Sequence, residues 1–367
     1  MELPQPDPSL PHLADVVPSV LATMGVAIFG SRIDLPGEVA AACVLLIDGL
    51  GAELLDTHAG DAPVLAGLRG QTLQAGFPST TVAGLAAVGT GCRSGEHGLV
   101  GLSFRIPGAG VVNALRWRQY PWGDDLRRSL PPEQAQPMPT TFERAASAGI
   151  AVSVISGAEF TDSGLTRAVL RGGRYVGVHA LGDLAASVQA ALAGGGFCYG
   201  YHGELDLLGH LYGPGSPAWR MQLRQIDRLV ESVIEHMPPG ALLAVVADHG
   251  MVAVDTADVI DADGCDPLLD GVQAIGGEPR ARHVYVRDGA ADDVLAAWRE
   301  ILTNRAWVVC REEAISAGWF GERVVAAARG SAAVVRRTVE PLESSLIGHH
   351  GSLTSAEQRI PLLLAFG

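Results

Sequence analysis

Five short runs of apolar residues recur along this chain, and each is bounded by small or polar residues that are typical of turns. The runs are Ala41 to Ile47, Ile150 to Ile155, Gly196 to Tyr201, Ala241 to Ala247 and Pro361 to Phe366. Runs that are apolar at successive positions are typical of strands buried on both faces of a parallel sheet. We therefore predict five buried, parallel strands.

Helical periodicity lies between these runs. From Arg220 to Met237, apolar residues recur at intervals of three and four, and Arg and Glu lie between them; the apolar set is Met221, Ile226, Leu229, Val230, Val233, Ile234 and Met237. A single apolar stripe of this kind predicts a helix packed on a sheet. Strands that alternate with helices predict an α/β fold with a doubly wound, mostly parallel sheet flanked by helices, whose ligands gather at the carboxyl ends of the strands.

Residues 276–321 interrupt this alternation. The segment is predicted to contain a strand (Arg282 to Val286), a helix (Ala290 to Leu302) and a second strand (Trp307 to Cys310). Because it falls between two parts of the main sheet, we interpret it as a small inserted α+β cap of the βαβ type. The catalytic core is then formed by residues 1–275 and 322–367.

Composition narrows the class of protein. The chain has 367 residues, of which 48% are hydrophobic and 18% charged, as in a globular protein. Its net charge is −14, and every basic residue is Arg. This balance argues against nonspecific binding of nucleic acid, which depends on basic patches. It does not exclude an anionic small-molecule substrate, because bound metal ions can supply the positive charge.

The cysteines and the N-terminal segment bear on location. Five cysteines are dispersed without a CxxC pair, which favours reduced thiols over disulfides or a cysteine zinc site. The N-terminal residues lack the pattern of a signal peptide, and no apolar stretch has the length of a transmembrane helix. We expect a cytoplasmic protein without a membrane partner.

The candidate chemistry lies where the predicted strands end. The residues are Asp48 after the first run, Asp206 and His210 after the third, Asp248 and His249 after the fourth, and His349 and His350 near the C-terminus. Each motif alone is commonly structural, since Asp-Gly often marks a turn. Together, they predict a crevice with mixed nitrogen and oxygen ligands, which favours two zinc ions, with manganese or iron as alternatives. Two adjacent ions would suit in-line phosphoryl transfer.

A candidate nucleophile lies in the segment Phe77-Pro78-Ser79-Thr80-Thr81, which precedes a helical pattern. Hydroxyl residues at this place commonly cap a helix. The same place suits catalysis, because a helix N-terminus presents free N–H groups to an anion, and a threonine oxygen there could attack phosphorus. The residues alone leave Ser79, Thr80 and Thr81 as alternatives.

The ordered motifs LLIDGLG, FPSTT with GTG and EHGLVG, DLLGHLYGP, VADHGM and GHHG together resemble the nucleotide pyrophosphatase/phosphodiesterase branch of the alkaline phosphatase superfamily. The resemblance covers residues 41–106, 196–252 and the final His-Gly segment. In that family the last threonine of F-P-T-x-T is the nucleophile, ten residues before the glycine of a Thr-Gly pair. Thr81 precedes Gly91 by ten residues, so the resemblance implies Thr81.

The resemblance also implies two metal sites. One ion would be held by Asp206, His210 and His350, and the second by Asp48, Asp248 and His249, with the Thr81 oxygen at the second ion. His350 is preferred over His349, because the family motif G-x-H-G matches residues 348–351. His349 would then be a neighbouring polar residue or a group that supports the ligands.

One position departs from the family pattern. Many members carry an Asn five residues after the His of the His-Gly pair, where its amide contacts a phosphate oxygen. Counting from His97, this position is Leu102, which supplies no side-chain donor. Asn113 or Arg105 are candidate replacements, although a structural role is the better interpretation of each.

These observations predict a hydrolase of phosphodiester or pyrophosphate bonds that works through a phospho-threonine intermediate. The alternatives within the superfamily are a phosphomonoesterase, a phosphonate hydrolase and a metal-dependent phosphomutase. A sulfatase is disfavoured, since no C/S-x-P-x-R motif is present. From another class, the chain could be a non-catalytic metal-binding protein of this fold. The segment Trp117 to Trp122 (WRQYPW) is either a contact for the leaving group or an ordinary packed loop.

Overall fold

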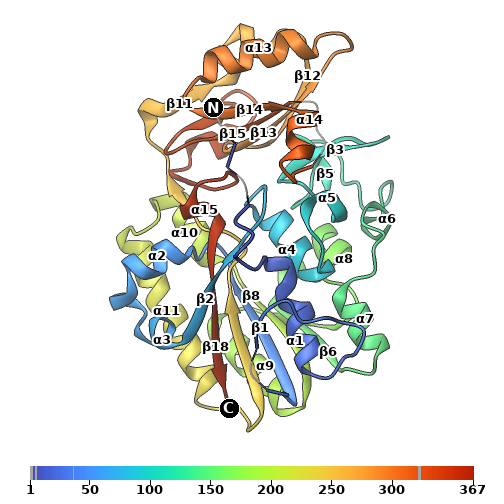
Figure 1. Ribbon diagram of the computed structural model, residues 1–367, viewed down its shortest axis with the longest axis vertical. Coiled ribbons are helices and arrows are strands. Elements are labelled where there is room, and N and C mark those ends of the chain that lie inside the picture. The colour runs from blue at the N-terminus through green and yellow to red at the C-terminus, as the bar shows by residue number, and fades with distance from the viewer. Residues whose placement is uncertain (1–2, 5, 36, 321–323) are drawn as a thin grey trace.

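The computed structural model describes every residue except 1–2, 5, 36 and 321–323 (Figure 1). The described residues form a central sheet of seven strands in the order β2-β18-β9-β1-β8-β6-β7. These strands are β1 (Ala41–Ile47), β2 (Arg69–Gln74), β6 (Val152–Gly157), β7 (Arg174–Val178), β8 (Gly196–His202), β9 (Ala241–Val246) and β18 (Arg359–Phe366).

The sheet is mostly parallel, as the sequence predicts. Strands β9, β1, β8, β6 and β7 run parallel, and every residue of the central strand β1 is buried. The prediction of a parallel strand is wrong for Pro361 to Phe366, because β18 runs antiparallel to both β9 and β2. An apolar run indicates burial on both faces but carries no information about strand direction.

Helices cover both faces of this sheet. On one side α9 (Leu181–Ala193) packs on β1, β6 and β8, and α11 (Pro217–Ile234) packs on α9. In front of the sheet in Figure 1 lie α1 (Val16–Thr23), α4 (Thr81–Thr90) and α7 (Thr141–Ser147), which contact one another. The remaining helices around this sheet are α2 (Ala52–Thr57), α3 (Pro63–Gly67), α5 (Ser94–His97), α6 (Pro132–Ala135), α8 (Gly164–Val169), α10 (Glu204–Tyr212) and α15 (Ser355–Gln358).

The amphipathic helix predicted near residue 220 is α11. It begins three residues earlier than expected, because the Ser216 side chain accepts a hydrogen bond from the Trp219 N–H and Pro217 occupies the first turn. Met221, which the sequence analysis placed in the apolar stripe, is 54% exposed. Trp219 and Leu223 are buried instead, since they lie seven and three residues before Ile226 on the same helix face.

A second sheet lies beyond the carboxyl ends of the parallel strands, at the top of Figure 1. It has four antiparallel strands in the order β12-β13-β15-β14. They are β12 (Val272–Glu278), β13 (Ala281–Val286), β14 (Ala306–Cys310) and β15 (Val324–Ala328), and with them go α12 (Asp266–Leu269), α13 (Ala291–Leu302) and α14 (Arg311–Ser316). Small pairings complete the described sheets: β10 (Val252–Ala253) with β17 (Gly348–His349), β11 (Val259–Asp261) with β16 (Ala333–Val335), and the hairpins of β3 (Ser103–Ile106), β4 (Gly110–Asn113) and β5 (Arg118–Gln119).

The four-stranded sheet belongs to two hydrophobic cores. Side chains alternate between the faces of a strand, so Ala281 and Val325 belong to the same hydrophobic core as the central sheet. On the opposite face, Val284 and Val324 pack with Trp298 of α13 in a separate core. One face of this sheet therefore faces the central sheet, and the other faces α13.

The predicted strands and helix of residues 276–321 correspond to β13, α13 and β14. The sheet that contains them also includes β15 and the start of β12, which lie outside that range. The predicted boundary at Gly321 falls outside the described residues, and the division into a core and an inserted cap stays a prediction.

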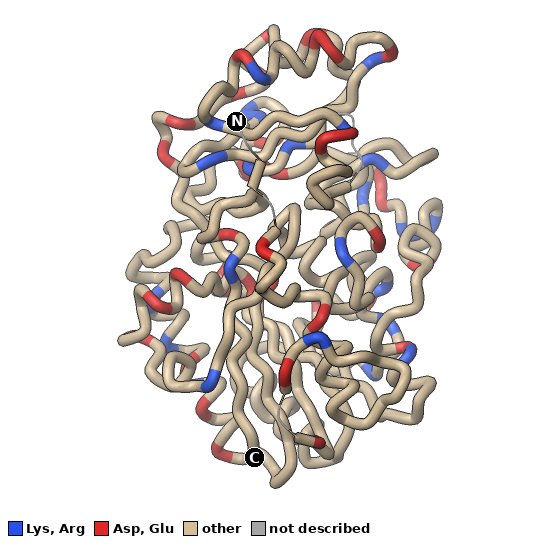
Figure 2. The backbone as a smooth tube through the Cα atoms, in the orientation of Figure 1, with Lys and Arg blue, Asp and Glu red and all other residues tan. Residues whose placement is uncertain are grey.

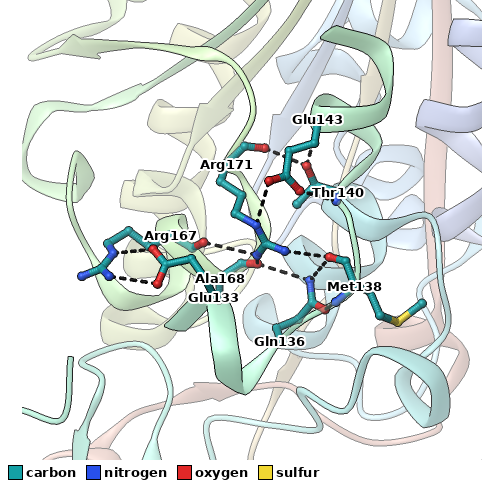
Figure 3. A network of polar contacts seen from close by, with 8 residues as sticks. All are labelled: Glu133, Gln136, Met138, Thr140, Glu143, Arg167, Ala168 and Arg171. Atoms are coloured by element: carbon teal, nitrogen blue, oxygen red, sulfur yellow. Dashed lines mark hydrogen bonds and ion pairs between the residues drawn. The ribbon is translucent and has the colours of Figure 1, made fainter. Parts of the chain in front are cut away.

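A polar network fixes the segment between the β3–β5 hairpins and β7 (Figure 3). Arg171 donates hydrogen bonds to the Glu143 carboxylate and to the Met138 carbonyl, and Arg167 forms a two-pronged ion pair with Glu133. The Thr140 hydroxyl accepts from the Glu143 N–H at the start of α7. These contacts tie α6, α7 and α8 together far from the candidate ligands.

Figure 2 shows acidic and basic residues interspersed over the backbone. None of the described helices is both long and apolar enough to cross a bilayer.

Candidate metal centre and active site

Three adjacent strands deliver the predicted ligands to one edge of the sheet. Asp48 follows β1, and Asp248 and His249 follow β9, which pairs with β1 in parallel register. Strand β8 lies on the other side of β1 and leads into α10, whose first turn carries Asp206. Neighbouring parallel strands end at the same edge, so these residues meet although they are distant in the chain.

Asp206 and His210 lie one helical turn apart on α10. Spacing of i and i+4 puts both side chains on the same helix face, and His210 Nε2 lies 3.2 Å from Asp206 Oδ2. The D-x-x-x-H motif thus presents a carboxylate and an imidazole side by side.

His350 reaches the cluster by a different route from the one expected. It follows β17, which pairs with β10 beyond the main sheet, rather than a strand of that sheet. An isolated bridge between Ser79 and Gly351 and a hydrogen bond from His350 Nδ1 to the Ser79 carbonyl hold it in place. Its Nε2 lies 3.7 Å from Asp206 Oδ1.

Asp48 and Asp248 each use one oxygen for the protein. Asp48 Oδ2 accepts from the Tyr201 hydroxyl at 2.5 Å, and Asp248 Oδ1 accepts from the Gly49 and His249 amides. Asp48 Oδ1, Asp206 Oδ1 and Asp248 Oδ2 are buried without a hydrogen-bond partner among the described residues. Since an unpaired buried carboxylate oxygen is costly, these three oxygens fit a cation.

The three imidazoles are oriented in a common way. The Nδ1 atoms of His210, His249 and His350 lie 2.7, 3.0 and 2.9 Å from the carbonyl oxygens of Gly348, Gly250 and Ser79. A carbonyl oxygen only accepts hydrogen bonds, so Nδ1 carries the proton and Nε2 keeps its lone pair. This is the tautomer that a metal-binding imidazole needs, with its second nitrogen held by the backbone.

The free ligand atoms form two overlapping groups within the described residues. Asp48, Asp248 and His249 offer atoms within 4.8 Å of one another, as do Asp206, His249 and His350. His249 Nε2 is 3.3 Å from Asp48 Oδ1 and 3.6 Å from Asp248 Oδ2. The donor set of carboxylate oxygens and imidazole nitrogens fits zinc chemistry.

The electrostatics of the cluster also favour a cation. Burial, and then the charge of Asp248, raise the pKa of Asp48 well above its usual value, and burial raises the pKa of Asp248. Burial acts to raise the pKa of Asp206, but the combined effects of the neighbouring His210, His350 and His249 outweigh it, so the pKa of Asp206 is lowered. Crowded carboxylates of this kind repel one another unless positive charge lies between them.

The three hydroxyl candidates for the nucleophile have different partners. Ser79 Oγ donates to the Ser352 carbonyl, and Thr80 Oγ1 donates to Glu278 Oε2. Thr81 Oγ1 lies 3.3 Å from His249 Nε2, beside the ligand cluster. Thr81 is therefore the hydroxyl that faces the metal-ligand atoms.

Thr81 is the first residue of α4, whose N-terminus points at this cluster. The helix comes close to the segment that follows β9, because a β-carbon on Gly84 would lie 2.5 Å from Asp248 Cβ. Glycine at this position lets the helix end, with its free N–H groups and positive dipole end, approach the carboxylates.

Leu102 stands at the position where many members of the resembled family carry an Asn, and its backbone has a defined partner. The Leu102 N–H donates to Glu278 Oε2 at 2.8 Å. Asn113 accepts from the Arg116 N–H, and Arg105 contacts Gln273 on β12. Asn113 thus closes the turn between β4 and β5, and Arg105 ties β3 to β12, in keeping with their structural interpretation.

Sequence reasoning missed Tyr201 and Glu278. Tyr201 comes at the end of β8 opposite Leu46, next to Asp48, and Glu278 is 4% exposed on β12. A tyrosine at the end of a buried strand and a carboxylate in an apolar, glycine-rich strand are the signals that point to them.

The neighbouring polar residues have ordinary partners. His349 Nε2 lies 3.2 Å from the Leu346 carbonyl, and burial lowers the pKa of His349 to about 3. In the WRQYPW segment, Trp117 is fully buried, and Tyr120 hydrogen-bonds Glu340. These contacts are those of a packed loop.

A pocket of about 310 Å³ lies at the ends of β6, β7 and β8. Its lining includes Phe160, Tyr201, Glu204 and Leu207, and none of the candidate metal ligands lines it. Its one link to the cluster among these residues is Tyr201, whose hydroxyl donates to Asp48.

The chain is similar to known phosphodiesterases in its sequence. The family model for type I phosphodiesterase / nucleotide pyrophosphatase matches residues 42–353. Ectonucleotide pyrophosphatase/phosphodiesterase family member 7 from Homo sapiens is 45% identical over 60 residues, which span 15% of this chain and 13% of that protein.

Solved structures share the fold over most of the chain. Murine ectonucleotide pyrophosphatase / phosphodiesterase 5 has a TM-score of 0.69 at 18% identity, covering 88% of this chain and 87% of that one; an inactive variant of it has been solved in complex with AMP. Phosphonoacetate hydrolase from Sinorhizobium meliloti, in complex with phosphonoacetate, has a TM-score of 0.64 at 20% identity, covering 89% of each chain.

Proposed function

This chain belongs to the type I phosphodiesterase / nucleotide pyrophosphatase family, and from that premise we propose that it is a metal-dependent hydrolase of phosphodiester or pyrophosphate bonds that forms a phospho-threonine intermediate. The observation that carries the proposal is the Thr81 hydroxyl, which lies 3.3 Å from His249 Nε2 at the N-terminus of α4. A nucleophile there has an anion-binding helix end beside it.

Asp206, His210 and His350 would hold one divalent cation, and Asp48, Asp248 and His249 the second, with the Thr81 oxygen adjoining it. The unpartnered carboxylate oxygens and the uniform tautomer of the three imidazoles support this assignment, and the mixed donor set favours zinc. When bound, the cations supply Lewis-acid chemistry, which lowers the pKa of the Thr81 hydroxyl and stabilises charge on the phosphoryl and leaving oxygens.

The residues of the chain then act in a simple order. Thr81 Oγ gives up its proton to solvent and attacks phosphorus, the bond from phosphorus to the leaving oxygen breaks, and the leaving group departs as an alcohol or phosphate after taking a proton from solvent. The amides at the start of α4 donate to the phosphoryl oxygens. Water then attacks phosphorus and displaces Thr81, which regains its proton.

The pocket lined by Tyr201, whose hydroxyl donates to Asp48, supports a place for the leaving group. Phe160 and Tyr201 offer aromatic surface, with ring centroids 6.3 Å apart. We infer that a small organic leaving group, such as a nucleoside or an aryl alcohol, binds there.

The proposal is tested with zinc-loaded protein and bis(4-nitrophenyl) phosphate. Thr81→Ala should abolish turnover with little loss of bound metal, since six other ligands remain, whereas Thr80→Ala should be mild. Acid-quenched wild-type protein should carry a phosphate on Thr81 by mass spectrometry. An inactive Thr80→Ala beside an active Thr81→Ala would assign the nucleophile to Thr80, and absence of turnover for every phosphodiester, monoester and phosphonate would favour a non-catalytic protein.

A further inference from the structure

Glu278 is a buried carboxylate that the proposed reaction leaves without a role. It lies at the end of β12, opposite Ala281, on the sheet face that packs with the catalytic core. Its Oε1 has no hydrogen-bond partner among the described residues. Burying a carboxylate is costly, so its contacts need an explanation.

The contacts of Glu278 are with residues that lie close in the chain to Thr81 and His350, and with Leu102. Oε2 accepts hydrogen bonds from the Leu102 N–H at 2.8 Å and from the Thr80 hydroxyl at 3.3 Å. Oε1 lies under Gly351, where a β-carbon would come within 3.3 Å of it. Glu278 therefore touches the residue before Thr81 and the residue after His350.

Thr80 is the residue that would normally close the end of α4. It occupies the N-cap position with extended backbone, at φ −142° and ψ 151°, yet its side chain makes no capping hydrogen bond. A threonine there ordinarily accepts from an amide of the first turn. The hydroxyl donates to Glu278 instead, which turns its oxygen away from the helix.

The first turn of α4 consequently keeps its amides free of a side-chain cap. The first intrahelical bond at this end runs from the Gly84 N–H to the Thr80 carbonyl. The preceding amides have no intrahelical acceptor and point out of the helix end. In a chain with Leu102 at the Asn position, they are the neutral donors beside Thr81.

We propose that Glu278 is a positioning residue that holds the Thr80 hydroxyl away from α4 and so keeps the helix amides available for the transferred phosphoryl group. The inference rests on the proposed function. Its specific consequence is a competition: without Glu278, the Thr80 hydroxyl caps the helix and competes with phosphate for the same N–H groups.

This competition can be tested by a double-mutant cycle. Glu278→Ala should lower kcat/KM for bis(4-nitrophenyl) phosphate by about five- to tenfold, the range expected of one N-cap hydrogen bond. Thr80→Val removes the hydroxyl at nearly constant volume and should change kcat/KM by less than about threefold. The double variant should recover to the level of Thr80→Val, because no hydroxyl is left to cap the helix.

Stability should move in the opposite direction to activity. In metal-free protein, adding Thr80→Val to Glu278→Ala should lower the melting temperature, since it removes the new cap. Affinity for inorganic phosphate, measured by calorimetry on the zinc-loaded proteins, should fall in Glu278→Ala and recover in the double variant. Glu278→Gln keeps an acceptor oxygen and should behave like the wild type.

Control variants separate positioning from folding. Glu278→Leu fills the same space without an acceptor. It should show the loss and the recovery expected of Glu278→Ala, and it takes the place of Glu278→Ala in the cycle if Glu278→Ala folds poorly. Glu340→Ala, which removes a buried carboxylate paired with Arg282, should show no recovery with Thr80→Val. A double variant no better than Glu278→Ala, in turnover and in phosphate affinity, would overturn the inference. A wild-type protein that binds phosphate with the expected cycle but turns over no ester would overturn only the proposed function.

Discussion

The Tyr201 hydroxyl donates a 2.5 Å hydrogen bond to Oδ2 of Asp48, and this leaves Oδ1 as the carboxylate oxygen nearest His249. One tyrosine thus decides which oxygen of Asp48 is free to bind a cation. Groups that orient a metal ligand in this way commonly contribute about 10- to 100-fold to the affinity for the metal.

Tyr201→Phe is therefore expected to weaken binding of one zinc ion by about 10- to 100-fold and to lower kcat with it. Competition with a chromophoric chelator measures the affinity. Tyr175→Phe is the matched control, because its hydroxyl donates to the Gly157 carbonyl instead. Equal losses in the two variants would mean that the Asp48 contact has no special effect.

The close approach of α4 to Asp248 gives a second prediction. A β-carbon on Gly84 would lie 2.5 Å from Asp248 Cβ and 3.2 Å from its Cα, so Gly84→Ala must displace the helix or the ligand. We expect a loss of about 1–3 kcal/mol of stability and at least about tenfold in kcat/KM. Gly182→Ala on α9 is the control, since a β-carbon there meets nothing within 4 Å. Thermal melts and turnover that leave both variants alike would contradict this.

Metal content is a third prediction. Purified protein loaded with zinc should hold close to two equivalents, from the two sets of ligands, and chelation should remove both the metal and the activity. Asp206→Asn should retain about one equivalent. Asp292→Asn, on the exposed surface of α13, should retain both. Elemental analysis that finds a single equivalent in the wild type would rule out the two-ion proposal.

Substrate charge gives a fourth prediction. Monoester dianions need more donors around their oxygens than diester monoanions, and Leu102 supplies no side-chain donor. An aryl phosphodiester should therefore have a higher kcat/KM than the matching monoester on one zinc-loaded preparation. Leu102→Asn should shift the ratio towards the monoester. A wild-type preference for the monoester of tenfold or more, about 1.4 kcal/mol, would point to a phosphatase.

Stability should depend on pH through Glu278. Burial is the main cause that raises its pKa to about 7, against the opposing effects of the Leu102 N–H and Arg282 and with a smaller contribution from Glu340. Native protein then holds a proton that unfolded protein has lost, so stability falls as pH rises from about 4.5 to about 7, by on the order of 3 kcal/mol.

Glu278→Gln should remove that part of the fall. Unfolding of metal-free protein by denaturant at pH 5 and pH 8 should show a smaller difference in the variant than in the wild type. Glu300→Gln, on the exposed face of α13, should keep the wild-type difference. An unchanged difference in Glu278→Gln would show that Glu278 ionises at its usual pKa.

The sequence predicted β1 and β9 closely because their residues are apolar at every position and are buried on both faces. It did not predict β2, an edge strand whose residues Arg69 to Gln74 are largely polar and exposed. The direction of β18 was wrong because direction depends on pairing with β9 and β2, which lie far away in the chain.

The site divides along the same line. Asp48, Asp248 and Asp206 could be found because they terminate or follow recognisable strands. Tyr201 and Glu278 could not, since their partners depend on how distant segments pack together. Tyr201 is opposite Leu46 in the β1–β8 pair, and Glu278 of β12 meets Leu102, just before β3, and Thr80, just before α4. Contacts of this kind are properties of the folded topology.

The position of β18 has a consequence for the order in which the chain can fold during synthesis. It lies between β2 and β9, although residues 75–358 separate it from β2 in the chain. Until the ribosome has made Arg359 to Phe366, β2 has no strand to pair with and β9 presents an open, apolar edge. Open edges invite pairing with other chains, and late long-range pairing slows folding. Nascent chains of this protein should therefore need protection from aggregation until β18 has been made.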